Sequence, residues 1–579
     1  MAINNPYVPG DPYSYDLKWI VRHLKEIDTI LSTLDETIVE KIKQLLDQHD
    51  PIYWKSAADL ISSDMKTPSL AYIQGYYEPG DGGANLYYVT SDYNDVLAAD
   101  FYLTLDGANR WAIPVICTPY VTPEMFGAKG DNSEDAKDAI NTAIKYALPV
   151  YFKPGAIYMI QDGDIVPVSG TIFIGNKCLL KLHSEETNSH IIKASGISDV
   201  LIEDMFFDGA SASGSTYASA IQLSNVRNVV IRDVTISNFT NNSVQFTYSD
   251  NCELSNMEAH DVGLTMAYNS SRVRFSNIRI WDCSFGYVLQ LKSCQDSVIE
   301  NSHVEMADAN EFGIMVSYGN AETDPEANSN NKIVNCTVRY DGSGTQQEAY
   351  RTNGPSDSIV YENCTADGAA FHISQCENCV IVNCTAINSI TSAIRLNGTE
   401  QTLIEGNMIS ASKQNGIHLA DGNKKVMITG NEIIHCNTSN NSNYRQIVVG
   451  SATEEDVYIV NNVIRRNDAT TYLISFSGTP GKIFVMNNIA QGGEAIMNGA
   501  IDKSTSRIIG NGYGVYRQTT AALNITGIVE IENGRSTVKQ AYDSAPAGTW
   551  SAGDICFKKT PTAAIPLGWS HDGSNWNVI

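Results

Sequence analysis

Charged residues are scarce in this sequence, and basic residues are the scarcer kind. Of 579 residues 18% are charged, with 39 Lys and Arg against 65 Asp and Glu, which gives a formal net charge of −26. Nucleic-acid-binding domains are usually basic, so this balance argues against nucleic acid as a partner. The same balance gives no indication of affinity for an anionic bilayer surface.

Long apolar runs are lacking as well. No stretch of 18 apolar residues occurs, so neither a transmembrane helix nor membrane insertion is predicted. The opening "MAINNPYVPGDPYSYD" has no basic segment followed by an apolar run and predicts no signal peptide, which places synthesis in a reducing cytoplasm. Twelve cysteines in so long a chain do not form a disulfide framework. Glycosylation of the three Asn-Cys-Thr tripeptides would require a secreted protein. Because no signal peptide is predicted, these tripeptides need another explanation.

The sequence does contain a repeat, with a basic step of about 20 to 24 residues. The phrase "CVIVNCTA" at 379–386 returns as "KIVNCTV" and "IVYENCTA", and related phrases share the pattern apolar-x-apolar-x-Asn-x-x-apolar. We call the Asn position of this pattern the corner. The corners are Asp233, Asn256, Asn277, Asn301, Asn335, Asn363, Asn383, Gly406, Gly430, Asn461 and Asn487.

The repeat predicts an all-β parallel β-helix, in which short strands stack coil upon coil and loops are inserted at turns. Apolar and polar residues alternate within each phrase, as in a strand with one face inside. The frame of a leucine-rich repeat is absent, and the alternation excludes helical solenoids. At each corner we expect an inward amide that bonds the neighbouring coils. Cys336, Cys364 and Cys384 follow corners directly and are expected to point inward as reduced, small apolar residues.

Two shorter regions precede the repeat. Residues 1–50 contain Leu and Ile at alternating steps of three and four over 17–38, which predicts a coiled coil of the kind that favours trimers or tetramers. A single amphipathic helix packed on the next domain is the alternative. Residues 51–123 contain "GYYEPGDGGANLYYV", whose glycines and Asp81 predict tight turns between aromatic strands. That stretch lacks the Lys-Ser/Thr of a phosphate loop, so nucleotide binding is not expected.

The repeat itself is assigned to residues 124–515 and a small C-terminal β module to residues 516–579. At the start of the repeat, Ser133 is expected to cap a helix that buries Ile140 and Ile144. Such a helix would cover the open sheet edge of the first coil.

The stretch "FGAKGD…DAINTAI…VYFKPGAIYMI" at 126–160 resembles the opening of the pectate-lyase-like, right-handed parallel β-helix domain of bacteriophage tailspikes. The stretch "GYYEPGDGGANLYYV" resembles the small module that precedes this domain in tailspikes and in preneck appendages of short-tailed phages. Together with the coils, the resemblance covers residues 50 to 515. Residues 545–579 look like short β modules that end some phage fibre proteins.

The resemblance implies a virion protein of the tail or neck, made in the host cytoplasm. It implies a homotrimer of coils packed side by side, with residues 51–123 as a particle-joining module and residues 1–123 in contact with other head or tail proteins. It carries over no catalytic residue, because the Gly-His-Gly of polygalacturonases and the Arg-x-Pro-x-x-Arg of pectate lyases are absent.

Candidate binding residues are found by counting from the corners. Positions +1 and +3 should point inward, and positions +2 and +4 should point outward. The outward +4 column then reads His260, Trp281, Glu305, Arg339 and Asp367. His260, Trp281 and Arg339 are predicted to contact substrate.

Three carboxylates are candidates for catalysis. Glu305 and Asp367 lie two predicted coils apart, about 10 Å at the backbone, and their side chains can reach the separation of an inverting glycosidase. Asp282, one coil from Glu305, would suit the shorter separation of a retaining enzyme.

The two longest steps, 301–335 and 335–363, add loops beside this column. They could wall a groove with Asp308, Glu311, Tyr318, Asp324, Glu348, Tyr350 and Arg351. Of these residues Tyr318, Tyr350 and Arg351 are predicted to bind substrate, and the alternative is an ordinary solvated exterior. Acidic residues between 305 and 326 could hold Ca²⁺, but no loop has diagnostic spacing, so no cofactor or metal is predicted.

Three functions remain open. The first is a virion spike that recognises a bacterial capsule or cell-wall polymer and degrades it, by hydrolysis rather than by a lyase reaction. The second is a non-catalytic β-helical adhesin or structural appendage. The third, a free-standing polysaccharide lyase or hydrolase, is disfavoured by the predicted oligomerising helix and the particle-joining module. Three chains of −26 would carry about −78, which opposes long-range steering toward an anionic polymer.

Overall fold

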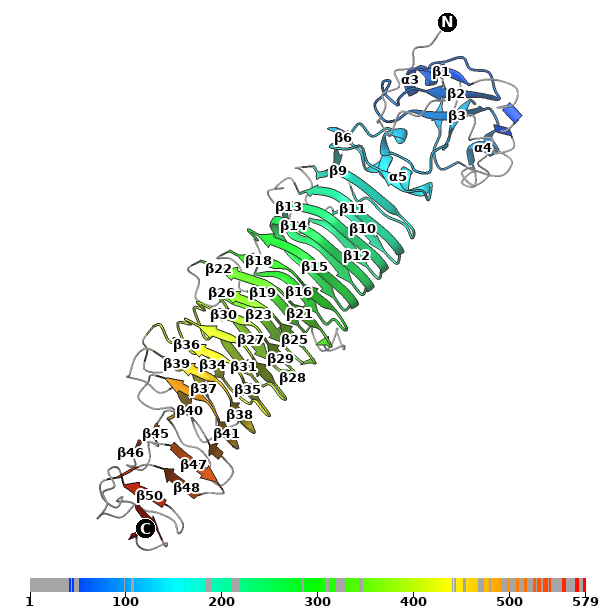
Figure 1. The fold of residues 1–579 in the computed structure, drawn as a ribbon. Coiled ribbons are helices and arrows are strands. Elements are labelled where there is room, and N and C mark those ends of the chain that lie inside the picture. The colour runs from blue at the N-terminus through cyan, green and yellow to red at the C-terminus, as the bar shows by residue number, and fades with distance from the viewer. Residues whose placement is uncertain are drawn as a thin grey trace. The chain divides into compact units, whose positions relative to one another are not determined.

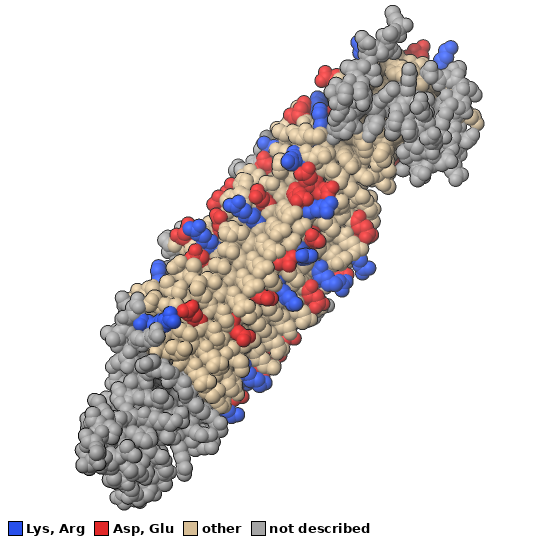
Figure 2. All heavy atoms as spheres, viewed as in Figure 1, with Lys and Arg blue, Asp and Glu red and all other residues tan. Residues whose placement is uncertain are grey.

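The computed structural model covers the N-terminal module at 51–123 and most of the repeat. It describes residues 41, 42, 44, 45 and 51–490 except 98, 106–108, 162, 184–189, 210–217, 284–285, 308–311, 319–327, 343–346, 440, 442–443, 451–453, 467–472 and 478–480, together with the backbone of strands beyond 490. The predicted coiled coil at 17–38 lies outside the described residues. No helix in the described part has the length and apolar content of a membrane span. Basic and acidic side chains are interspersed on the face drawn in Figure 2.

The chain forms two compact units. The first comprises residues 1–246 and 251–262, and the second comprises residues 247–250 and 263–579. In both, parallel strands follow one another from coil to coil (Figure 1). The predicted all-β parallel β-helix is therefore confirmed.

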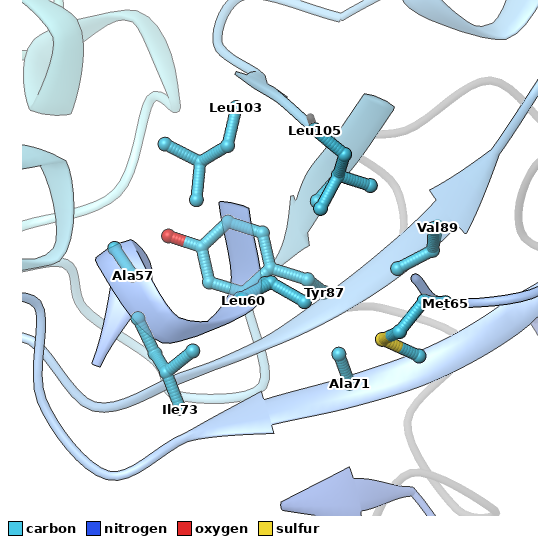
Figure 3. Packing of buried hydrophobic residues seen from close by; sticks show 10 residues of the cluster. Ala57, Leu60, Met65, Ala71, Ile73, Tyr87, Val89, Leu103 and Leu105 are labelled. Carbon is cyan, nitrogen blue, oxygen red and sulfur yellow. The ribbon is translucent and has the colours of Figure 1, made fainter. Parts of the chain in front are cut away.

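The first unit begins with a separate five-stranded sheet (Figure 1). Its order is β1 (Ile52–Trp54), β2 (Ser69–Ile73), β3 (Asn85–Thr90), β5 (Trp111–Val115) and β4 (Leu103–Thr104), accompanied by helices α3 (Ala57–Ile61) and α4 (Tyr93–Leu97). Tyr87 of β3 is fully buried and packs among Leu60, Leu103 and other apolar side chains (Figure 3). The sheet therefore has a hydrophobic cluster of its own.

The predicted turn at Asp81 is confirmed. The Asp81 carboxylate accepts hydrogen bonds from the backbone N–H groups of Tyr76, Tyr77, Glu78 and Gly83 at 2.7–3.2 Å. One carboxylate thus satisfies four amides that the tight turn would otherwise leave unpaired.

The coils of the first unit follow a short 3₁₀ helix, η2 (Pro123–Phe126), and the helix α5 (Lys137–Lys145). Their strands are β6 (Asp131–Asp135), β7 (Val150–Tyr151), β8 (Ile157–Ile160), β9 (Ile172–Leu182), β10 (His190–Ser195), β11 (Ser198–Asp208), β12 (Ser219–Ser224) and β13 (Arg227–Thr247), with β14 (Asp250–Tyr268) spanning the boundary. Helix α5 buries Ile140 and Ile144 as predicted. The predicted cap is wrong, because the N–H of Ser133 bonds Asp131 within β6 and the helix begins only at Lys137.

In the second unit the strands after β15 (Ser271–Trp281) form three faces. The first face, before each corner, comprises β17 (Val298–Glu300), β21 (Lys332–Val334), β25 (Val360–Glu362), β29 (Val380–Val382), β32 (Leu403–Glu405), β35 (Met427–Thr429), β38 (Val457–Val460), β41 (Ile483–Met486) and β44 (Arg507–Ile509). The second face, after each corner, comprises β18 (His303–Met306), β22 (Thr337–Tyr340), β26 (Thr365–Asp367), β30 (Thr385–Ile387), β33 (Met408–Ser410), β36 (Glu432–Ile434), β39 (Val463–Arg465) and β42 (Ile489–Gln491).

The third face closes each coil. It comprises β16 (Tyr287–Lys292), β19 (Phe312–Ser317), β23 (Glu348–Asn353), β27 (Ala370–Ser374), β31 (Ile394–Asn397), β34 (Ile417–Leu419), β37 (Ile447–Val449), β40 (Ile474–Phe476), β43 (Met497–Asn498) and β45 (Val515–Arg517). Short strands β20 (Asn328–Ser329), β24 (Ser356–Asp357) and β28 (Cys376–Glu377) join the third face to the first. The backbone ends in β46 (Asn524–Thr526), β47 (Ile528–Glu532), β48 (Arg535–Lys539), β49 (Ala541–Tyr542), β50 (Ile555–Lys558), β51 (Gly568–His571) and β52 (Trp576–Val578).

The corner residues are selected for their backbone conformation. All eleven corners have positive φ, between 51° and 67°, in the left-handed region. Asn, Asp and Gly tolerate this region best, which explains the composition of the column. The expected inward amide is wrong at Asn335, Asn363 and Asn383, because these side chains are exposed.

The inward position is the residue directly after each corner. Cys336, Cys364 and Cys384 occupy it as buried free thiols, which confirms the predicted reduced cysteine stack. On the later coils the same position holds Asn407, Asn431, Asn462 and Asn488, all buried. In this amide ladder each Asn donates both its backbone N–H and its side-chain Nδ2 to the next Asn Oδ1 at 2.9–3.0 Å.

A second column of buried polar side chains runs from Thr399 through Asn423 to the carboxyl group of Glu454. Asn423 donates to both carboxyl oxygens of Glu454, at 3.0 and 3.1 Å, and Glu454 is fully buried. Burial raises the pKa of Glu454 to about 7 despite these hydrogen bonds.

The raised pKa gives a stability that depends on pH. The folded state binds the Glu454 proton more tightly than the unfolded state, so its contribution is full below about pH 4.5 and is lost as pH rises through about 7. We expect the melting temperature to fall between pH 5 and 8. In Glu454→Gln, where one amide oxygen can accept both bonds as in the amide ladder, this part of the fall should disappear. Scanning calorimetry of both proteins measures it, and an identical pH profile would contradict the assignment.

Candidate functional site

The predicted alternation about the corners is confirmed on the second face. In β22, β26 and β30 the +1 and +3 residues are buried, whereas the +2 and +4 residues reach solvent. The register pairs Glu305 with Arg339 and Arg339 with Asp367, so the +4 column runs straight across three coils. Arg339 therefore lies between the two candidate carboxylates.

Trp281 is an outward residue, partly exposed at the end of β15. The guanidinium of Arg279 lies 5.0 Å from the centre of its ring. Arg279 also pairs across the coils, because its position is in register with His303 and its guanidinium lies 3.9 Å from Glu305. An indole, a guanidinium and a carboxylate thus meet at one surface.

The carboxylates of this surface have local partners. Glu305 Oε1 lies 3.2 Å from Nε2 of His303, and Asp367 accepts a hydrogen bond of 2.8 Å from the Asn388 amide. Asp282 is exposed, directly after β15, with φ of 53°. His260 belongs to the first unit, where its ring lies 3.3 Å from Asp261.

The prediction for Tyr350 is wrong. Its side chain is fully buried, and its hydroxyl lies 2.7 and 3.0 Å from the backbone oxygens of Cys336 and Thr365, either of which can accept its hydrogen. Its ring stacks on Phe371 at 4.5 Å. Tyr350 is the inward neighbour of Arg351 in β23, so it fills the core and does not line a groove.

The other loop predictions have mixed outcomes. Tyr318 is half-buried directly after β19, with its N–H bonded to the Asn353 oxygen at 2.9 Å. Arg351 is an outward residue of the third face. Asp308, Glu311 and Asp324 lie outside the described residues.

Arg351 belongs to a cluster that counting from the corners did not find. Its Nη1 donates to Glu348 Oε2 at 2.6 Å, and Nδ1 of His372 lies 2.6 Å from Glu348 Oε1. Burial alone would raise the pKa of Glu348, but the hydrogen bonds and charges of His372 and Arg351 outweigh it and hold the pKa below its ordinary value. Glu348 is therefore ionised at neutral pH, and Nδ1 of His372 lies within hydrogen-bond distance of both its carboxylate and Nη1 of Arg351.

No metal geometry accompanies these groups. Across the described part of the chain no set of three or more His, Cys, Asp or Glu side chains is arranged to hold a metal ion.

A family model described as right handed beta helix region matches residues 186–365. No curated protein matches the chain.

Solved structures resemble the chain at low identity. A tailspike protein double mutant of E. coli bacteriophage HK620 has a TM-score of 0.49 and 10% identity, covering 80% of this chain and 91% of that one. The tailspike protein gp49 of Acinetobacter baumannii bacteriophage Fri1, a capsular polysaccharide depolymerase, has a TM-score of 0.38 and 12% identity, covering 66% and 72%. The surface adhesin PfbA of Streptococcus pneumoniae has a TM-score of 0.37 and 16% identity, covering 72% and 98%. None of these likenesses assigns a function or a residue role to this chain.

Proposed function

We propose that the protein is a virion tailspike or neck appendage whose β-helix binds a bacterial surface glycopolymer, a capsule or cell-wall polymer. The observation that carries the proposal is the outward surface of Trp281, Arg279, Glu305 and Arg339. A sugar ring has an apolar C–H face that stacks on indole, while guanidinium and carboxylate groups bond its hydroxyls. Trp281 points outward and remains partly exposed, and a large aromatic that fills no core is typical of a binding surface.

The virion context is supported by the resemblance of the sequence at 126–160 and around Asp81 to tailspikes and preneck appendages. In this proposal residues 1–123 contact other head or tail proteins, and the Leu/Ile seam at 17–38 holds three chains together. Sedimentation equilibrium measures the assembly, and a monomer would contradict it.

A depolymerase is the second candidate, favoured by Glu305 and Asp367 on either side of Arg339. Two coils separate the carboxylates by about 10 Å at the backbone, from which their side chains reach the spacing of an inverting glycosidase. Glu305 with Asp282 is the alternative pair for a retaining reaction. A protein that binds without cleaving is an adhesin on the same scaffold.

Trp281→Ala should weaken binding to whichever polymer the unaltered protein retains on an array of bacterial capsular and cell-wall polysaccharides. Loss of ring stacking is expected to cost about tenfold in affinity while the melting temperature stays unchanged. Tyr102→Ala, at an exposed aromatic of the N-terminal module, is the matched control and should bind as before.

The polymer that the array identifies also serves as the substrate in a test of cleavage. Glu305→Gln should stop the release of new reducing ends while sparing binding, if the protein is a hydrolase. Binding unaffected by Trp281→Ala, or a sharply lowered melting temperature, would contradict the proposed surface.

A further inference from the structure

A second outward column crosses the third face. The register pairs Arg351 with His372, His372 with Arg395, and Arg395 with His418, on β23, β27, β31 and β34. Neighbouring coils are about 4.8 Å apart, so four nitrogen-bearing side chains follow one another along the axis. We call these four residues the basic column.

Two atoms of the basic column are buried without a partner. Among the described residues nothing bonds Nε of Arg351 or Nε2 of His372. His372 as a whole is only 8% exposed. A buried polar group without a hydrogen bond costs free energy. At these two atoms the described part of the protein supplies no hydrogen-bond partner of its own.

The charges of the column are not balanced. Glu348 is the one carboxylate among the described residues that pairs with any of the four, through Arg351 and His372. Arg395 is exposed and forms no ion pair with a described residue. Burial, followed by the charges of Arg395 and His372, lowers the pKa of His418 to about 4, so this ring is neutral at neutral pH. The column therefore presents an unpaired guanidinium beside a neutral imidazole.

An aromatic platform lies on the same face. The rings of Tyr287 and Phe312 are stacked with centres 5.3 Å apart and planes at 12°, and Tyr287 is 39% exposed. The guanidinium of Arg351 lies 5.2 Å from the Phe312 ring and links the platform to the column. The register joins Tyr287 to Phe312 and Phe312 to Glu348.

We propose that the third face binds an acidic glycan, with Arg395 pairing with a sugar carboxylate and the Tyr287–Phe312 platform stacking on a sugar ring. A guanidinium matches a carboxylate by two parallel hydrogen bonds, which makes Arg the suited cation. His418, which is partly exposed beside Arg395, bonds a neighbouring hydroxyl of the sugar. This assignment rests on the proposed function and adds to it the chemical class of the polymer.

The negative charge of the chain does not forbid such a ligand. Charges more than about 8–10 Å from a site are largely screened at physiological salt, so the few groups lining the site decide the sign that the ligand meets. The distant charge lowers the association rate, whereas contact with Arg395 sets the dissociation rate.

The test uses the full chain and paired probes. Polygalacturonate, alginate, hyaluronan and polysialate, each with its carboxyl-reduced form, are compared by affinity electrophoresis for the unaltered protein, Arg395→Gln, Lys332→Gln and Trp281→Ala. Lys332 is exposed in β21 on the first face, so its substitution removes the same charge elsewhere. We expect retention by at least one acidic probe and none by its reduced form. Arg395→Gln should weaken it about tenfold and Lys332→Gln should not.

The outcomes separate the two proposals. Equal retention by acidic and reduced probes, or acidic binding that survives Arg395→Gln and is lost in Trp281→Ala, would overturn the acidic site and leave the proposed function standing. Retention of neutral bacterial polymers alone would do the same. A protein that retains no glycan of either kind would overturn both.

Discussion

Gly368→Ala is expected to unfold the middle of the second unit. Gly368 follows β26 with φ of 81°, and a Cβ built there would lie 1.8 Å from the backbone oxygen of Tyr340 on the preceding coil. The two backbones cannot move apart by that much without disrupting the parallel pairing of β22 with β26, which joins Arg339 to Asp367 one residue before Gly368. The clash adds to the strain of a left-handed alanine, so we expect a loss of more than about 4 kcal/mol.

Gly398→Ala provides the matched control. Gly398 also has positive φ, 61°, but its added Cβ would meet only a Gln375 side-chain carbon at 3.9 Å. It should lose only the left-handed penalty of about 1–2 kcal/mol. Thermal unfolding followed by circular dichroism compares the two variants, and equal losses would mean that the close approach to Tyr340 is not what restricts position 368.

The repeat was predictable because its signal is local. A left-handed corner between two short strands admits few residue types, so Asn and Gly recur at Asn335, Asn363, Asn383 and Gly406 whatever the loops do. The alternation on either side then fixed which residues of β22 and β26 face out. The sequence could not distinguish an amide kept for its backbone conformation from one kept for its side-chain bonds, so the inward side chain was assigned one residue too early.

The third face was not predictable by the same counting. Arg351 follows its corner, Asn335, by 16 residues, whereas His372 follows Asn363 by 9. The loops between the second and third faces vary in length, so a fixed offset from the corner fails there. For the same reason Tyr350 could be placed beside Arg351 on the surface, although a strand must send one of two neighbours inward.

Asn431→Ala, in the buried amide ladder, is expected to lower the stability of the protein. The Oδ1 of Asn431 accepts both the N–H and the Nδ2 of Asn407, and its Nδ2 donates to the oxygen of Ile404 and to Asn462. Alanine removes the partner of the Asn407 N–H, one of the two acceptors of the Asn407 Nδ2 and the side-chain donor to the Ile404 oxygen, and water cannot replace the amide without opening the stack. An unpaired buried group costs about 1–3 kcal/mol, so we expect a loss of about 2–4 kcal/mol after partial relaxation.

The control for this loss is Asn383→Gly, at an exposed corner. Glycine keeps the left-handed conformation, and the Asn383 side chain lies outside the buried ladder, so stability should change by only a few tenths of a kcal/mol. Chemical denaturation of both variants gives the comparison. If the corner amides held the coils together, Asn383→Gly would be the more damaging change. The buried position directly after each corner predicts the reverse, because only there does an amide satisfy groups that solvent cannot reach.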